Sequence, residues 1–285
     1  MFKRQTSGSI VCPSCGRLVG VNDRECFNCG RRNPGMWGFA PVLQKLGLNI
    51  GFTQIVMTGC AILYGLTLVT DWKNVGNSGM SILAPGTPAL FLFGASGAWP
   101  IFGFGRWWTP LSAAWLHGGL LHIGFNMLWL RQIMPAVEEY YGTGRLIIIY
   151  TVSSYTGFLL TSLMYFLPLG FLSGAYFTVG ASAPLFGLFG ALLLYSKRVG
   201  HTALGQEIWR WVIIFVVIGL IVPFVDNWAH LGGLAGGWLT ARILDPLKPE
   251  NANQMLVALL CLLLIAASIV ASVLLGAPLF RAPVA

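Results

Sequence analysis

The sequence predicts an all-α polytopic membrane protein whose helices follow a small metal-binding module. Of its 285 residues, 56% are hydrophobic and only 9% are charged, whereas a soluble globular domain carries about 25% charged residues. Four runs without Asp, Glu, Lys or Arg are long enough to cross a bilayer, which needs about 20 apolar residues. A soluble protein is therefore excluded. The runs cover Leu46 to Thr70, Trp107 to Leu130, Leu146 to Ser196 and Asn251 to Phe280.

The first element, residues 1–35, is a polar module with two matched CxxC pairs, each followed by a glycine. Four thiolates at this spacing favour a structural zinc site, and Gly16 and Gly30 permit the left-handed turn that such a pair requires. Two disulfides would need an oxidising compartment, and a redox site needs only one pair. Because so short a module cannot build its own core, zinc must stabilise its fold. The predicted ligands are Cys12, Cys15, Cys26 and Cys29.

The membrane part follows an amphipathic linker over residues 36–48. We expect a six-helix core over 49–245 and an extra helix with a tail over 246–285. Residues 74–105 lack charges but contain many Gly and Pro residues, so they predict a long loop between the first two spans. The seven predicted spans cover about residues 49–70, 118–137, 146–167, 179–196, 208–224, 227–244 and 254–279.

The charges indicate how these spans are oriented. With a cytoplasmic N-terminus, 14 of the 17 Lys and Arg residues lie on the inner side, and only Lys73, Arg106 and Arg281 lie outside. This asymmetry follows the positive-inside rule. We therefore expect a multi-pass protein of a bacterial plasma membrane with its C-terminus outside. The basic residues are scattered at span ends and form no basic face, so nucleic-acid binding is not expected.

Polar side chains recur near the outer end of three predicted spans. His122 and Asn126 are four residues apart, so they share one face of the second span, while Ser182 and His230 open the fourth and sixth spans. At about 1.5 Å per residue, the distance along the helix is ~24 Å from His122 to Glu138, ~22 Å from Ser182 to Lys197 and ~22 Å from His230 to Asp245 at the inner ends. They therefore share one level in the membrane, within reach of water from outside.

This set of side chains is typical of acyl transfer. Ser182 becomes a nucleophile if His230 takes its proton, because burial keeps the imidazole neutral. No carboxylate is available at this depth except Asp226 at the start of the sixth span. His122, Asn126 and the Ser182 backbone N–H offer donors for the oxyanion of a tetrahedral intermediate. A catalytic dyad without an acidic third member is the resulting prediction.

The motifs resemble those of the rhomboid intramembrane serine proteases over about residues 49–245. HxxxxHxxxN occurs on the second span, GxS on the fourth and AHxxGxxxG on the sixth. The resemblance implies Ser182 as nucleophile, His230 as base, and His122 and Asn126 as oxyanion ligands. It further implies supporting positions near the site: His117 as a structural histidine, Phe186 stacked on the catalytic imidazole, Gly180 in the GxS motif, and Gly233 and Gly237 at a close helix contact.

Two departures from the family pattern concern the site. The family usually has Gly directly after the serine, whereas this chain has Ala183, whose methyl is expected to narrow substrate choice or slow the enzyme. The first outer loop has Arg106-Trp107 but Gly105 where the family has Trp. His201 is expected to be a solvated loop residue.

The resemblance implies an intramembrane serine endopeptidase that cleaves transmembrane segments near their outer end without a catalytic cofactor. Its partners are then transmembrane substrates and the lipid bilayer. Separately from the resemblance, we expect the zinc module to contact a cytoplasmic partner, because four thiolates leave no open position on the metal. The alternative is an inactive rhomboid-like protein that binds membrane clients. A proton-coupled transporter is disfavoured because membrane carboxylates and inverted repeats are lacking.

Overall fold

The computed structural model describes residues 5–12, 16–30, 34–35, 51–77, 81–222, 225–248 and 250–281. It divides into two compact units, residues 1–54 and 55–285. The predicted linker over 36–48 and the ligand Cys15 lie outside the described residues.

The N-terminal unit contains a two-stranded antiparallel hairpin. Strand β1 (Ser9–Val11) pairs with β2 (Leu18–Gly20), and Ile10 faces Val19 across the pair. Both side chains point inward, while the opposite face of each strand is exposed, as the period of two in a strand requires. A small buried cluster results, which consists of Ile10, Cys12, Val19, Val21 and Cys26.

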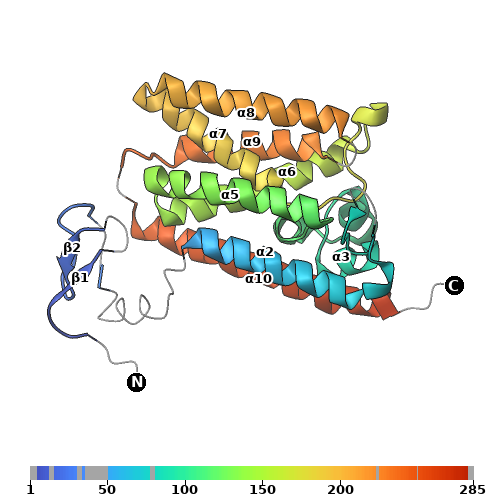
Figure 1. Ribbon diagram of the computed structural model, residues 1–285, viewed down its shortest axis with the longest axis horizontal. Helices are drawn as coiled ribbons and strands as arrows, with labels where there is room; N and C mark the ends of the chain where they lie inside the picture. Colours follow the sequence, from blue (N-terminus) through green and yellow to red (C-terminus); the bar gives the residue numbers. More distant parts are fainter. Residues whose placement is uncertain are drawn as a thin grey trace. The chain divides into compact units, whose positions relative to one another are not determined.

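The second unit is helical (Figure 1). Its long helices occupy the ranges that the hydrophobic pattern predicts, with end positions shifted by a few residues. They are α2 (Phe52–Thr70), α5 (Leu120–Tyr141), α6 (Thr143–Met164), α7 (Ser182–Val199), α8 (Thr202–Ile221), α9 (Asn227–Ile243) and α10 (Ala252–Arg281).

The largest shift is at α8, which begins six residues before the predicted start at 208. His201, expected to be a solvated loop residue, is exposed but has a structural role: its Nδ1 accepts a hydrogen bond from Leu204 N at 3.2 Å and caps the helix. The first turns of α8 are polar, so hydropathy alone missed them, whereas the cap starts the helix.

Helices α6, α7 and α9 form the centre of the unit. Helix α7 packs against both others, α8 packs on α7, and α10 packs on α6. Tyr150 and Phe158 of α6 and Phe186 and Phe189 of α7 are fully buried here. The central helices are less apolar than α8 or α10, because protein rather than lipid surrounds them.

Four helices are long and apolar enough to cross a membrane by composition: Phe52–Thr70, Thr143–Met164, Thr202–Ile221 and Asn253–Pro278. Helix α9 has only 17 residues, and α5 carries Arg131, Glu138 and Glu139. The four apolar helices make the protein an integral membrane protein. That α5, α7 and α9 also cross the membrane stays a prediction.

The segment between α2 and α5 is more ordered than a long loop. It contains η2 (Trp72–Asn74), α3 (Thr87–Phe93), a π-helical turn η4 (Trp99–Gly103), α4 (Thr109–Ser112) and η5 (Ala113–Trp115). Glycine and proline do interrupt it, as predicted, but the pieces between them form short helices. Pro lies at the first or second position of α3, η4 and α4, where its missing N–H costs nothing.

Candidate active site

Ser182 is the first residue of α7, and an unusual backbone turn precedes it. Gly180 has φ +137°, a conformation that residues with a side chain rarely adopt. Its N–H donates to Ala113 O at 3.0 Å, which fixes the turn to the start of η5. The chain therefore enters α7 abruptly, and the Ser182 hydroxyl is half-buried at the helix N-terminus.

His230 is the fourth residue of α9 and contacts Ser182 directly. Its Nε2 is 2.9 Å from Ser182 Oγ, which is a good hydrogen-bond distance. The imidazole is 5% exposed, so the contact is largely protected from water. If Nε2 accepts the serine proton, Nδ1 carries the ring hydrogen, and within the described residues Nδ1 has no hydrogen-bond partner. The pair has no acidic third member there.

Phe186 holds the plane of this imidazole. Its ring stacks on His230 with centroids 4.1 Å apart and an interplanar angle of 6°. Phe186 lies four residues after Ser182, so both side chains project from the same face of α7. The stack and the hydrogen bond together leave the imidazole little freedom to rotate.

Glycines bring α9 close enough to α7 for these contacts. A Cβ at Gly233 would overlap the Ala183 carbonyl oxygen, and one at Gly237 would overlap the Gly187 carbonyl oxygen. The two helices therefore touch backbone to backbone, the geometry that small-xxx-small spacing permits. Gly233 and Gly237, which we predicted at a close approach to the fourth span, both lie at this contact between α9 and α7.

The methyl of Ala183 is accommodated on α6. A Cβ at Gly157 of α6 would lie 2.9 Å from Ala183 Cβ, so the absent side chain at 157 leaves room for the alanine. Ala183 is fully buried. The departure from the usual Gly is matched by a glycine on the neighbouring helix, which the sequence pattern alone did not reveal.

His122 faces the turn before Ser182. The N–H of Gly118 donates to His122 Nδ1 at 3.2 Å, so a neutral ring carries its hydrogen on Nε2. A Cβ at Gly180 would lie 2.7 Å from that Nε2 and 3.7 Å from Ser182 Oγ. The space that glycine leaves open is therefore bordered by an N–H donor on one side and the serine oxygen on the other.

Asn126 and His117 lie beside this group, and within the described residues neither side chain forms a hydrogen bond with Ser182 or His230. Asn126 is buried, and its Nδ2 donates to His122 O at 2.9 Å, which leaves a second hydrogen on the same nitrogen. His117 is fully buried and packs edge-on against His122, with centroids 5.2 Å apart. Among the described residues, neither nitrogen of His117 has a hydrogen-bond partner.

Asp226 has a role that the sequence analysis missed. Its Oδ1 accepts from Ala229 N at 3.0 Å and from Thr161 Oγ1 at 2.8 Å, so it caps α9 and ties that helix to α6. His230 follows one turn later, and its N–H donates to Asp226 O at 3.1 Å. An Asp directly before a predicted helix is a capping signal that would have identified it.

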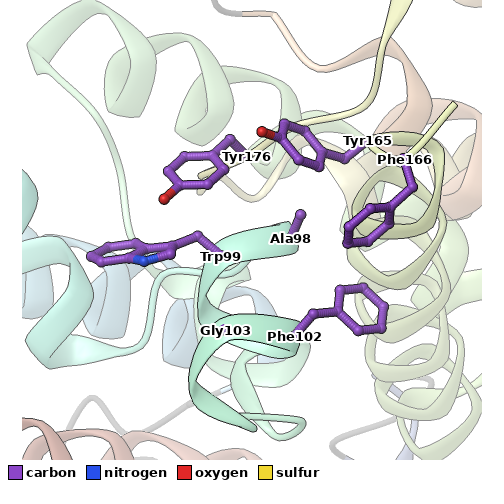
Figure 2. A pocket seen from close by; sticks show the side chains of 7 residues that line it. All are labelled: Ala98, Trp99, Phe102, Gly103, Tyr165, Phe166 and Tyr176. Atoms are coloured by element: carbon purple, nitrogen blue, oxygen red, sulfur yellow. The ribbon is translucent and has the colours of Figure 1, made fainter. Parts of the chain in front are cut away.

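An aromatic cavity of about 280 Å³ lies in this unit and does not include Ser182 or His230. Figure 2 shows Trp99 and Tyr176 on one side of it and Phe102 and Phe166 on the other. Trp99 stacks on Tyr176 with centroids 5.8 Å apart. The cavity therefore borders the π-helical turn rather than the dyad. Its lining residues are Ala98, Trp99, Phe102, Gly103, Tyr165, Phe166 and Tyr176.

Three of the predicted zinc ligands converge in the N-terminal unit. The sulfurs of Cys12, Cys26 and Cys29 lie within 4.8 Å of one another, and Cys12 Sγ is 3.7 Å from Cys29 Sγ. Tetrahedral zinc with Zn–S bonds of about 2.3 Å separates sulfurs by about 3.8 Å. Gly16 N donates to Cys12 O and Gly30 N to Cys26 O, both at 2.9 Å, and both glycines have φ +70°. The matched turns and spacing fit a zinc site.

Comparison with known proteins identifies the family. The family model described as Rhomboid domain matches residues 105–247, half of the chain. The chain belongs to the rhomboid family. The match covers the helices that carry His122, Ser182 and His230, and the rhomboid match confirms the family that the motifs indicated.

Individual rhomboid proteins align with more of the chain than the domain model does. Rhomboid protease GluP of Bacillus subtilis is 33% identical over 183 residues, which are 63% of this chain and 34% of that protein. RHOMBOID-like protein 7 of Arabidopsis thaliana is 33% identical over 168 residues, 57% of this chain and 51% of that protein. This rhomboid therefore spans about a third to a half of the length of these relatives.

Proposed function

We propose that this rhomboid is an intramembrane serine endopeptidase with Ser182 as nucleophile and His230 as general base. The observation that carries the proposal is the 2.9 Å contact between His230 Nε2 and Ser182 Oγ in a buried setting. The imidazole takes the hydroxyl proton as Oγ attacks the scissile carbonyl carbon, and it returns the proton to the leaving amine. Water then hydrolyses the acyl-enzyme by the same steps.

The negative oxygen of the tetrahedral intermediate needs donors beside Ser182. His122 supports this role because its Nε2 borders the space beside Gly180 and, with Nδ1 accepting from Gly118 N, carries the ring hydrogen. Asn126 has one unused amide hydrogen on the same helix face, and the Ser182 N–H lies at a helix N-terminus. Each preorganised donor of this kind is typically worth about 10² to 10³ in rate.

Transmembrane segments that unwind easily are the proposed substrates. A helix buries its scissile carbonyl in its own hydrogen bonds, so Gly, Pro or polar residues near the cut lower the cost of extending it. The predicted orientation, with the N-terminus in the cytoplasm and the C-terminus outside, puts Ser182 in the outer half of the membrane. Cuts are then expected near the outer end of the substrate.

The experiment uses the purified chain in lipid vesicles with a single-span test substrate carrying Gly and Pro near its outer end. Cleavage products are mapped by mass spectrometry. We expect cleavage by the native chain and none by Ser182→Ala or His230→Ala. Undiminished cleavage by Ser182→Ala rejects the serine mechanism, and binding of the substrate without any cleavage supports the client-binding alternative instead.

We further propose that the N-terminal unit holds one structural zinc ion through Cys12, Cys15, Cys26 and Cys29. The geometry of the three described cysteines supports this, because their sulfurs match tetrahedral spacing. Four thiolates leave no open coordination position, so the ion would serve folding and contact with a cytoplasmic partner rather than chemistry. Metal analysis of the full chain under reducing conditions tests it, with one zinc per chain expected.

A further inference from the structure

Arg106 is a buried cation in the segment between α2 and α5. Only 3% of it is exposed, and its guanidinium lies 4.3 Å from the centre of the Phe91 ring. Nη1 donates to Phe91 O at 2.6 Å, at the end of α3, and Nη2 donates to Ser272 O at 2.9 Å, on α10. One side chain therefore joins its own segment to two helices, one of which is 166 residues away in sequence.

Burial lowers the pKa of Arg106 to about 10, which still leaves the group protonated at neutral pH. A buried charge is costly unless hydrogen bonds compensate it, and losing such a bond costs more than losing one at the surface. The two carbonyl oxygens therefore anchor the segment firmly as long as α10 stays in place.

Further contacts surround the same point on α10. Trp108 Nε1 donates to Ser272 Oγ at 3.0 Å, and Ser272 is fully buried. A Cβ at Gly94 would lie 2.5 Å from Ser272 Oγ, and one at Gly276 would lie 3.3 Å from Leu92 Cδ1. Glycines thus let the segment and α10 approach closely.

The same segment continues toward the candidate nucleophile. Ser96 and Thr178 exchange two backbone hydrogen bonds, at 3.0 and 2.8 Å. Ala98 N donates to Ala175 O and Trp99 N to Tyr176 O, both at 3.0 Å, and Figure 2 shows the Trp99 and Tyr176 rings side by side. Residues 96–99 therefore pair with residues 175–178, which lie four residues before Ser182.

We propose that α10 positions the 175–178 segment ahead of Ser182 by anchoring residues 94–106 through Arg106 and Ser272. Arg106 and Ser272 are then positioning residues, because neither touches the dyad. The anchoring is independent of any activity, whereas its effect on catalysis rests on the proposed function.

Hydrogen exchange of the full chain in detergent, read by mass spectrometry, tests the anchor. Arg106→Lys keeps the positive charge but loses the planar fork that reaches two carbonyls at once. Ser272→Leu places bulk against Gly94 without changing charge. We expect both variants to accelerate exchange about tenfold or more over 94–106 and over 175–180.

The matched control is Ser268→Ala, one turn earlier on α10. Ser268 is also buried, but its Oγ donates to Ile265 O within its own helix. We expect exchange in both segments to stay at the native rate in this variant. Protection of α6 and α9 peptides reports whether each variant is folded. If the bulky variant Ser272→Leu fails to fold, Ser272→Ala replaces it. Ser272→Ala loses only the hydrogen bond from Trp108, so we expect it to accelerate hydrogen exchange over 94–106 by a smaller factor.

Two results overturn the proposal. Native exchange over 94–106 in Arg106→Lys, or in Ser272→Ala where the others fail to fold, shows that α10 does not anchor the segment. Faster exchange over 94–106 with native exchange over 175–180 shows that the anchor does not reach the nucleophile. Both readings hold even if the chain cleaves nothing, so they are separate from a failure of the proposed function.

A kinetic measurement then separates positioning from general stability. If the native chain is active, Arg106→Lys is expected to lower kcat about tenfold at an unchanged KM, because the loosened segment holds the nucleophile rather than the substrate. A raised KM with native kcat contradicts this part of the proposal.

Discussion

Gly180 shows how much of the site depends on one residue. Its φ of +137° turns the chain into α7, and its missing side chain leaves the space between His122 Nε2 and the Ser182 hydroxyl open. We interpret that space as the place where the oxyanion of the intermediate sits. On this interpretation, a glycine at 180 both permits the backbone turn and leaves room for the substrate oxygen.

Gly180→Ala is therefore expected to reduce cleavage by at least about 10², the typical effect of losing one oxyanion donor. The methyl would lie 2.7 Å from His122 Nε2 and occupy the open space. Gly170→Ala is the matched control, because Gly170 also has positive φ but has open space around it. Initial cleavage rates of the two variants decide the question. Equal rates would mean that the space is not used.

Variants of the oxyanion donors should give graded losses. His122→Ala and Asn126→Ala are each expected to slow cleavage about 10² to 10³-fold, while Ser182 still reacts measurably with a fluorophosphonate. The double variant should lose less than the product of the two, since both donors serve one oxygen. Native turnover in either single variant, at equal expression and folding, would assign that side chain a structural role only.

The motif spacing predicted Ser182, His230 and His122 as a group, and the structure brings these three together. The sequence could not predict that Gly157 makes room for Ala183, or that the Ser272 carbonyl accepts a hydrogen bond from Arg106. Such pairs depend on which helices become neighbours, and no local pattern in a single sequence records that. Asp226 is different, because its capping position was readable before the helix was seen.

At the scale of helices, the crossing of α7 and α9 sets the distance between serine and histidine. Gly233 and Gly237 place the α9 backbone against the carbonyl oxygens of Ala183 and Gly187. A methyl at either glycine would push the helices apart, so the contact between Ser182 and His230 would lengthen with the helix separation.

Gly233→Ala is expected to destabilise the protein by about 1 to 3 kcal/mol or more, because its methyl meets backbone that cannot repack. Cleavage should fall in parallel. Gly124→Ala on α5 is the matched control, since Gly124 has open space around it and alanine favours a helix. Thermal unfolding in detergent compares them. An unchanged melting temperature in Gly233→Ala would contradict the close crossing.

Hydropathy predicted the long helices but not the short ones between α2 and α5. Helix α3 and the π-helical turn η4 are 7 and 5 residues long and are interrupted by Gly and Pro. Pieces of this length have little intrinsic stability and form through tertiary contacts. Contacts such as those of Arg106 with α3 and α10 supply what the local sequence lacks.

At the scale of the whole molecule, the cysteine cluster and the dyad lie in different compact units, residues 1–54 and 55–285. Chelation is therefore expected to remove zinc and loosen the N-terminal unit while cleavage by Ser182 continues at the native rate. Metal content, exchange over residues 5–30 and cleavage rate are measured on the same sample. Loss of cleavage together with the metal would contradict a purely structural ion.

The central claim is that His230 activates Ser182 as a nucleophile. The most direct measurement is labelling of the full chain with a fluorophosphonate, with the modified residue located by mass spectrometry. The account predicts a single label on Ser182 in the native chain, none in Ser182→Ala, and a strongly slowed reaction in His230→Ala. A folded native chain that takes no label at Ser182, or that labels equally fast without His230, would contradict it.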